Sequence, residues 1–166
     1  ILDVSEDGDF GTDLNLALGF RYNTLFSVGA TDGLTYTSFL PADTLTPPGL
    51  ADPVTTADPA TSANDVVVSP DGRYVYAIFD DGTIRTYDAS SGALVGLPVD
   101  TEDTLSPETI AISGTNIYVT YADSDQVSVY NYEGAAAEEP ELVQTSTVDG
   151  DPIGLVYCAP ARLSCS

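Results

Sequence analysis

The sequence predicts an all-β protein built from four-stranded antiparallel meanders, the repeating unit of a β-propeller. Short runs of β-branched and aromatic residues recur along the chain of 166 residues, and several alternate with period 2, as strands do. Turn signals rich in Gly, Asp and Pro separate these runs. The stretch from Asn64 to Leu97 shows the pattern most completely, and weaker copies of it lie on both sides.

This central stretch divides into four strands joined by tight turns. The continuous β-branched run Val66 to Val68 suits a strand that is buried on both faces. Ser69 to Gly72 (SPDG) is turn chemistry, because Pro presets φ and Gly accepts a positive φ. Two further turn signals, Asp80 to Gly82 and Ala89 to Gly92, separate the next runs. The second, third and fourth strands are expected at residues 74–79, 84–87 and 93–99.

The segment VSPDGRYVYAIFDDGTIRTYDASSGALVG, Val68 to Gly96, resembles the YVTN-type and related WD-like repeats. In those repeats an SPDG-R-YVYV hairpin leads into a strand that ends in Asp and a Ser-Gly turn. The resemblance implies a β-propeller, in families that include lactonase-like enzymes, surface-layer proteins and binding scaffolds. Because one fold serves many functions, the resemblance implies an architecture and not an activity.

The repeats divide a single domain, residues 1–166, into blades. Blade one is expected at about 14–60, blade two at 64–100, blade three at 106–148, and the start of a fourth at 151–166. Tyr76 and Tyr118 hold corresponding positions, within the spacing of about 40 to 45 residues typical of WD-type blades. Propellers close with about four to eight blades. We therefore expect a partial propeller. The strand Ile1 to Val4, further sequence or a neighbouring chain would complete it. We favour completion by further sequence or by a neighbouring chain.

Two stretches interrupt the repeat. Pro41 to Ala63 is rich in Pro, Thr, Ala and Asp, so we expect it to hold the outer strand of blade one within an irregular excursion. Gly134 to Pro140 is expected to be a loop inserted before the outer strand of blade three.

The composition excludes several function classes. The formal net charge is −22, from 26 acidic and 4 basic residues, which argues against nucleic acid and anionic membrane surfaces as partners. Without His or Lys the chain has no Ser-His-Asp triad, imidazole zinc site, Schiff base or P-loop. No apolar run approaches the roughly 18 residues of a membrane span, so no membrane insertion is predicted. The acidity itself keeps a protein surface soluble.

An acidic stretch near the N-terminus is the one candidate metal site. Oxygen-bearing side chains alternate there around a Gly, which resembles the start of EF-hand-like or FG-GAP-type calcium loops. Leu14 stands where an EF-hand needs Glu, and an ordinary acidic surface loop would show the same pattern. Calcium is the candidate cofactor, and its candidate ligands are Asp3, Ser5, Asp7, Asp9 and Asp13.

Two cysteines, Cys158 and Cys165, lie close together in CAPARLSC. The spacing is not CxxC and no other metal ligands are nearby, so a local disulfide is favoured over free thiols. A disulfide predicts a location outside the reducing cytosol: extracellular, at the cell surface or periplasmic. The chain begins with Ile, which indicates a mature or trimmed product.

The repeat also sorts the charged residues onto two faces. In a propeller the loops after the second and fourth strands share one face, and here they carry ten carboxylates: Asp32, Asp80, Asp81, Asp100, Glu102, Asp103, Asp123, Asp125, Asp149 and Asp151. Arg21, Arg73 and Arg162 occupy equivalent turns on the opposite face. These Arg residues either cap turns beside an Asp, or form a face that meets the acidic, cation-collecting face of a neighbour.

Three functions remain open at this point. The favoured hypothesis is a non-catalytic extracellular scaffold that self-associates in a surface layer or filament, or binds other surface proteins. The alternative is a fragment of a lactonase-like or dehydrogenase-like propeller enzyme with carboxylate metal ligands. A third hypothesis is a calcium-dependent adhesion module built around Asp3 to Asp13.

Overall fold

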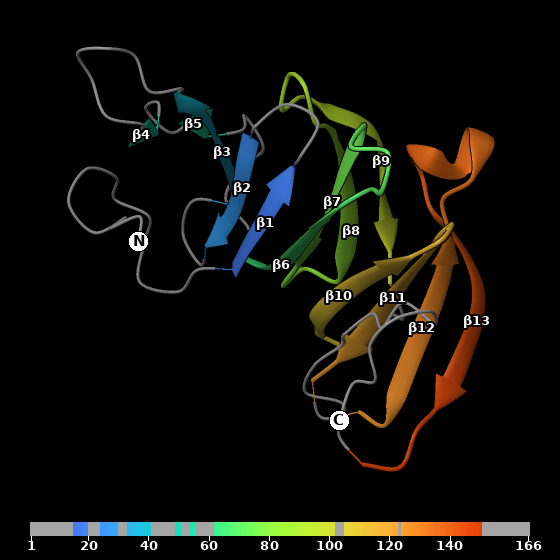
Figure 1. Ribbon diagram of the computed structural model, residues 1–166. Coiled ribbons are helices and arrows are strands. Elements are labelled where there is room, and N and C mark those ends of the chain that lie inside the picture. Colours follow the sequence, from blue (N-terminus) through green and yellow to red (C-terminus); the bar gives the residue numbers. More distant parts are fainter. Residues whose placement is uncertain are drawn as a thin grey trace, which may run out of the picture.

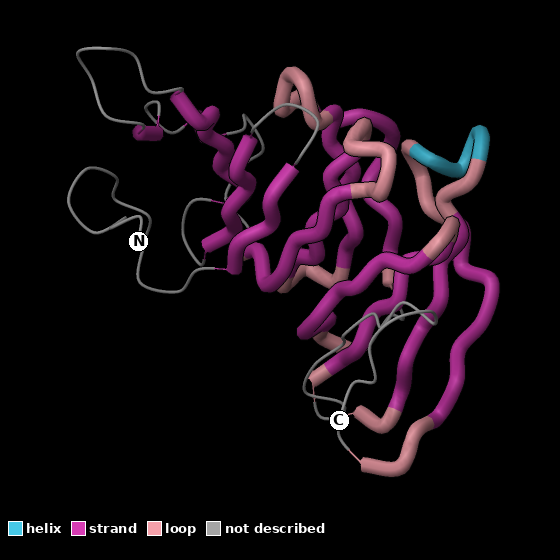
Figure 2. The backbone as a smooth tube through the Cα atoms, in the orientation of Figure 1, coloured by secondary structure: helices cyan, strands magenta, loops and turns pink. Residues whose placement is uncertain are grey.

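The structure is a computed structural model that describes residues 15–19, 24–29, 33–40, 49–50, 54–55, 62–101, 105–122 and 124–150 (Figure 1). It confirms the all-β prediction, because these residues form three antiparallel sheets. The only helix among them is the short 3-10 helix η1 (Gly134–Ala137), drawn in cyan in Figure 2. None of the described helical segments is long and apolar enough to cross a membrane.

Each sheet is one blade of a propeller. Blade one comprises β1 (Asn15–Gly19), β2 (Thr24–Gly29), β3 (Gly33–Leu40), β4 (Gly49–Leu50) and β5 (Val54–Thr55). Blade two comprises β6 (Ala63–Val68), β7 (Tyr74–Phe79), β8 (Thr83–Asp88) and β9 (Leu94–Asp100). Blade three comprises β10 (Pro107–Ser113), β11 (Asn116–Tyr121), β12 (Gln126–Asn131) and β13 (Glu141–Thr147).

The innermost strand of each blade is its first. Strand β6 contacts β1 and β2 on one side and β10 on the other, so the three sheets fan out around their first strands (Figure 1). The same irregularity recurs in β6 and β10, since the register shifts between Ala63 and Asp65 and again between Pro107 and Thr109. Blades two and three therefore share a bulge at the corresponding position of the inner strand.

The SPDG turn folds as its residue types predict. Gly72 adopts a φ of 70°, which Gly accepts without steric cost. The Ser69 hydroxyl oxygen accepts the main-chain N–H groups of Arg73 at 3.1 Å and Tyr74 at 3.0 Å. These bonds close the turn and set the start of β7.

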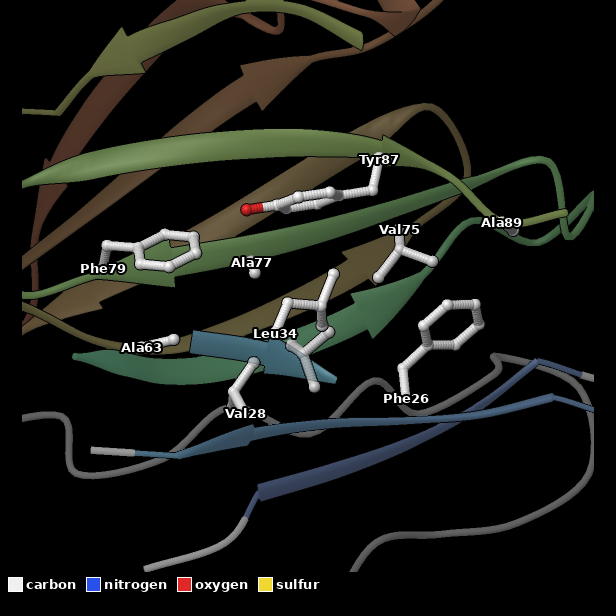
Figure 3. Packing of buried hydrophobic residues seen from close by; sticks show 10 residues of the cluster. Phe26, Val28, Leu34, Ala63, Val75, Ala77, Phe79, Tyr87 and Ala89 are labelled. Atoms are coloured by element: carbon white, nitrogen blue, oxygen red, sulfur yellow. The ribbon is translucent and has the colours of Figure 1, made fainter. Parts of the chain in front are cut away.

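A hydrophobic core fills the space between blades one and two. Phe26, Val28 and Leu34 of blade one pack against one face of blade two (Figure 3). Because side chains alternate along a strand, only every second residue of β7 reaches this core. The blade-two side chains labelled in the figure are those of Ala63, Val75, Ala77, Phe79, Tyr87 and Ala89.

The opposite face of blade two forms a second core with blade three. Tyr76, Ile78 and Ile84 pack there against side chains of β10, β11 and β12. The Val66 to Val68 run of β6 serves both cores, since Val66 and Val68 belong to the first and Val67 to the second. The sequence predicts a strand with both faces buried for this run, and the packing of the three Val residues agrees with it.

The two interrupted stretches differ from the plain repeat in structure. The outer strand of blade one is split into β4 and β5, which both pair with β3. Ala63, the end of the expected excursion, already belongs to β6. The expected loop between β12 and β13 contains the short helix η1.

Candidate functional site

The inner strands of blades two and three are joined by polar side chains. The Asn64 amide donates to the carbonyl oxygen of Pro107 at 2.7 Å. One carboxylate oxygen of Asp65 accepts the N–H of Val66 at 2.8 Å, and the other accepts the N–H of Ile110 at 3.0 Å. Burial raises the pKa of Asp65 above its ordinary value, and the two hydrogen bonds partly oppose this shift. Asp65 therefore spans two blades at the inner end of the sheets.

Asp81, one of the two carboxylates in the turn between β7 and β8, is neutralised within blade two. Asp81 Oδ1 accepts the Thr83 hydroxyl at 2.6 Å, and Asp81 Oδ2 pairs with the guanidinium of Arg85. The Arg85 side chain is buried and lies over the Phe79 ring, with 4.2 Å between its Cζ and the ring centroid. Asp81 is thus a structural partner of Arg85, although its place in the repeat suggested a cation-collecting carboxylate.

The predicted grouping of loops on two faces is correct for the described turns. The N–H of Thr101, after β9, donates to the carbonyl of Gly82 in the β7–β8 turn at 2.7 Å. The N–H of Ala89, after β8, donates to the carbonyl of Arg73 in the β6–β7 turn at 2.9 Å. The first pair of turns carries exposed Asp80 and Asp100. Within the described part of the chain, no three carboxylates or cysteines gather closely enough to hold a metal ion.

The face with Arg73 is not basic overall. Arg73 is exposed, and its guanidinium carbon lies 5.4 Å from the centroid of the Tyr74 ring. Asp71 is exposed in the same turn, and its carboxylate accepts the N–H of Arg73 at 3.0 Å. Asp88, at the adjoining turn, adds a second carboxylate to this face. The simpler interpretation, Arg beside a turn-capping Asp, therefore fits Arg73.

A row of tyrosines lies where blades two and three meet on this side. The ring centroids of Tyr74 and Tyr76 are 6.4 Å apart, and those of Tyr76 and Tyr132 are 5.4 Å apart. Burial raises the pKa of Tyr76 far above its ordinary value. Burial, and then the charge of Asp71, raises the pKa of Tyr132. The row continues the core of the blade interface to the surface, since Tyr74 and Tyr132 are half-buried.

The Ser-Gly turn after β8 is held by Asp88. Its Oδ1 atom accepts the N–H of Ser90 at 3.0 Å and the N–H of Ser91 at 2.9 Å, as well as both hydroxyls. Hydrogen bonds from Ser90 and then Ser91 hold the pKa of Asp88 below its ordinary value, although burial opposes them. The Tyr36 hydroxyl of blade one donates to the carbonyl of Ser91 at 3.1 Å, so this turn also joins two blades.

Several predicted site residues lie outside the described residues. They include the whole calcium-loop candidate, Asp3, Ser5, Asp7, Asp9 and Asp13, and both cysteines, Cys158 and Cys165. Seven of the charged turn residues do so as well: Asp32, Glu102, Asp103, Asp123, Asp151, Arg21 and Arg162. The proposed start of a fourth blade, 151–166, is likewise outside.

Comparisons with known proteins bear on the fold. No protein-family model and no curated protein matches the sequence. The complex of KlAtg21 with the coiled-coil of AgAtg16 matches with a TM-score of 0.58 at 11% identity, over 82% of this chain and 42% of the solved chain. A protein from Lactobacillus plantarum matches with a TM-score of 0.59 at 22% identity, over 81% and 41%. Apo AztD from Citrobacter koseri matches with a TM-score of 0.51 at 18% identity, over 83% and 48%.

These matches identify the architecture and no narrower group. The matching structures are propeller-type proteins, and the chain forms β-propeller blades. The chain spans less than half the length of each of these three solved chains. Membership of the YVTN-type group stays a prediction from the repeat residues.

Proposed function

We propose that the chain is a non-catalytic scaffold, located outside the cytoplasm, that acts by contact with copies of itself or with other surface proteins. One observation carries this proposal: three carboxylates of the described residues form hydrogen bonds or an ion pair that hold the blades and turns together. Asp65 joins two inner strands, Asp81 neutralises Arg85, and Asp88 closes a turn. Polar side chains used in this way make a rigid scaffold, which can present its surface to other protein chains.

Light scattering on the purified chain tests self-association. The proposal expects a mass above the 17.3 kDa of one chain, at an ionic strength high enough to screen the −22 charge. A monodisperse species of 17.3 kDa at all salt concentrations would refute self-association. A pull-down from a surface-protein extract would then decide whether other proteins are the partners.

The enzyme alternative rests on the resemblance of the central repeat to lactonase-like propellers. It predicts hydrolysis of lactones that is lost when exposed turn carboxylates such as Asp80 and Asp100 are neutralised together. Hydrolysis at the uncatalysed rate across a panel of lactones would remove this alternative. It would leave the scaffold proposal unchanged.

The calcium alternative is tested by thermal unfolding. A rise in the unfolding midpoint at about micromolar calcium, unmatched by sodium, would assign the stretch Asp3 to Asp13 as a calcium site. Replacement of Asp7 by Asn should then abolish the rise. An unchanged midpoint in calcium would leave that stretch as an acidic segment.

A further inference from the structure

The large apolar side chains that the described residues leave exposed all lie on two outermost strands. Leu94 and Leu97 of β9 are 42% and 70% exposed, and Leu142 and Val143 of β13 are 48% and 58% exposed. Strands β9 and β13 are the last strands of blades two and three, so these side chains lie on the outer rim of the blades (Figure 1). Exposed apolar side chains that gather in one region mark interaction surfaces.

A loop from blade three crosses to blade two at this rim. This crossing loop, residues 132–140, includes η1, which Figure 2 shows in cyan. The Tyr76 hydroxyl donates to the carbonyl of Ala137 at 2.8 Å. The N–H of Leu97 donates to Glu139 Oε1 at 3.0 Å. A Cβ on Gly96 would lie 2.4 Å from the Glu138 carbonyl oxygen, so the loop packs directly on β9.

These contacts place carboxylates of blade three beside apolar side chains of blade two. Glu138 and Glu139 are exposed and lie against β9, since the Glu138 carbonyl approaches Gly96 and Glu139 Oε1 accepts the N–H of Leu97. We call Leu97, Glu138, Glu139, Leu142 and Val143 the rim surface. The sequence contains no Lys or Arg between residues 93 and 100 or between 132 and 148. The rim surface is therefore both apolar and purely acidic.

A second copy of this chain does not complement the rim surface. A two-fold contact would place Glu138 and Glu139 against the same residues of the partner, and like charges in contact oppose association. Of the two Arg residues in the described part of the chain, Arg85 is buried and Arg73 lies in the turn before β7. Nucleic acids and anionic lipids are excluded by the same sign of charge.

We propose that the rim surface binds a segment of another protein in which Lys or Arg residues alternate with apolar residues. Leu97, Leu142 and Val143 supply apolar area for affinity, and Glu138 and Glu139 orient the cationic side chains and speed their approach. The proposal deepens the scaffold function by naming the chemistry of a partner. Its biological role rests on the scaffold function. Binding of a peptide to the rim surface can be measured whether or not that function holds.

A labelled peptide tests the proposal. A peptide of about ten residues that alternates Lys with Val is titrated with the whole chain and followed by fluorescence anisotropy. We expect saturable binding that weakens about tenfold or more in the Leu97→Ser/Leu142→Ser and Glu138→Gln/Glu139→Gln double variants. The same peptide with Glu in place of Lys should not bind.

Two matched controls stand on the same blades. Leu94→Ser changes an exposed Leu of β9 that pairs with Tyr87, whose side chain lies in the core toward blade one, so peptide binding should be unchanged. Glu108→Gln removes an exposed carboxylate from the inner strand β10 and should also leave binding unchanged. Circular dichroism and the thermal midpoint confirm that every variant is folded.

Four results would overturn the proposal. They are no binding by the folded wild-type chain, equal binding of the Glu peptide, equal loss in the Leu94→Ser or Glu108→Gln control, and loss of self-association in the rim variants. The last result would assign the rim surface to a second copy. Failure of peptide binding would leave the light-scattering result intact, so the rim proposal and the scaffold proposal fail separately.

Discussion

The carboxylate of Asp65 in β6 accepts the main-chain N–H of Ile110 in β10 at 3.0 Å, so one side chain joins the inner strands of two blades. The bulge that shifts the register between Ala63 and Asp65 accompanies this contact. The corresponding bulge of blade three falls between Pro107 and Thr109, where Thr109 takes the place of Asp65. Its hydroxyl bonds to that of Thr120 at 2.7 Å within blade three, so only the bulge of blade two carries a side chain that joins two blades.

Replacement of Asp65 by Ala should lower the free energy of unfolding by about 2 kcal/mol. It leaves two N–H groups, those of Val66 and Ile110, without their acceptor. Urea unfolding of both proteins measures the difference. Glu108→Gln on the neighbouring inner strand is the control and should change stability by less than about 0.5 kcal/mol, because Glu108 is exposed. Equal effects of the two substitutions would contradict the bridging role of Asp65.

Replacement of Gly92 by Ala should cost more than replacement of Gly114 by Ala. Both glycines have positive φ, 67° and 59°, so each substitution costs about 1–2 kcal/mol of backbone strain. A Cβ at Gly92 would in addition lie 2.2 Å from a ring carbon of Tyr36, whereas at Gly114 it meets open space. We expect about 1–3 kcal/mol of extra loss at Gly92 from this overpacking. Matching unfolding curves for the two variants would show that the Tyr36 contact is unimportant.

Asp81 and Arg85 should show strong coupling in a double-mutant cycle. Asp81→Ala alone removes the carboxylate that neutralises the buried guanidinium of Arg85 and should cost about 3 kcal/mol. Arg85→Leu combined with Asp81→Ala removes both charges and should restore part of that loss. Chemical unfolding of the wild type, both single variants and the double variant gives the coupling energy. Strictly additive losses would contradict a neutralised buried pair.

Asp65 and Asp88 should influence stability in opposite directions as the pH changes. Because the pKa of Asp65 is raised in the folded state, the contribution of Asp65 to folding stability is complete below the ordinary pKa of 3.8. This contribution is lost as the pH rises through the folded-state pKa. Because the pKa of Asp88 is lowered in the folded state, the contribution of Asp88 to folding stability is complete above pH 3.8. This contribution is lost as the pH falls through the folded-state pKa.

Thermal midpoints of the wild type, Asp65→Asn and Asp88→Asn across acidic pH measure these two trends. With rising pH, the advantage of the wild type over Asp65→Asn should shrink and its advantage over Asp88→Asn should grow. Parallel profiles for the two variants would show that the two carboxylates do not differ in this way.

Salt should raise the thermal midpoint of the whole protein. With a formal charge of −22 and no Lys, repulsion among turn carboxylates such as Asp80, Asp100 and Asp125 opposes folding and is screened by ions. The midpoint should rise between about 10 mM and about 1 M NaCl, where the Debye length falls from about 30 to about 3 Å. A midpoint that stays constant over this range would contradict the prediction.

The sequence by itself determined the strands and turns of the blades. The SPDG turn, the Asp81-Gly82 hairpin and the period-2 runs are local signals, because each needs only the backbone preferences of its own residues. Strand β7 therefore begins and ends where the sequence indicated. The paired positions of Tyr76 and Tyr118 also follow from the repeat, since each is the third residue of a second strand.

Only the tertiary structure decided what the polar and exposed side chains do. No local pattern shows that Asp65 reaches Ile110, that Arg85 is buried against Asp81, or that Glu139 meets Leu97. Each of these contacts depends on the packing of one strand or blade against another, because the partners are brought together by the register of a hairpin or the angle between sheets. The rim surface exists for the same physical reason: residues 132–140 extend far enough to reach the neighbouring blade.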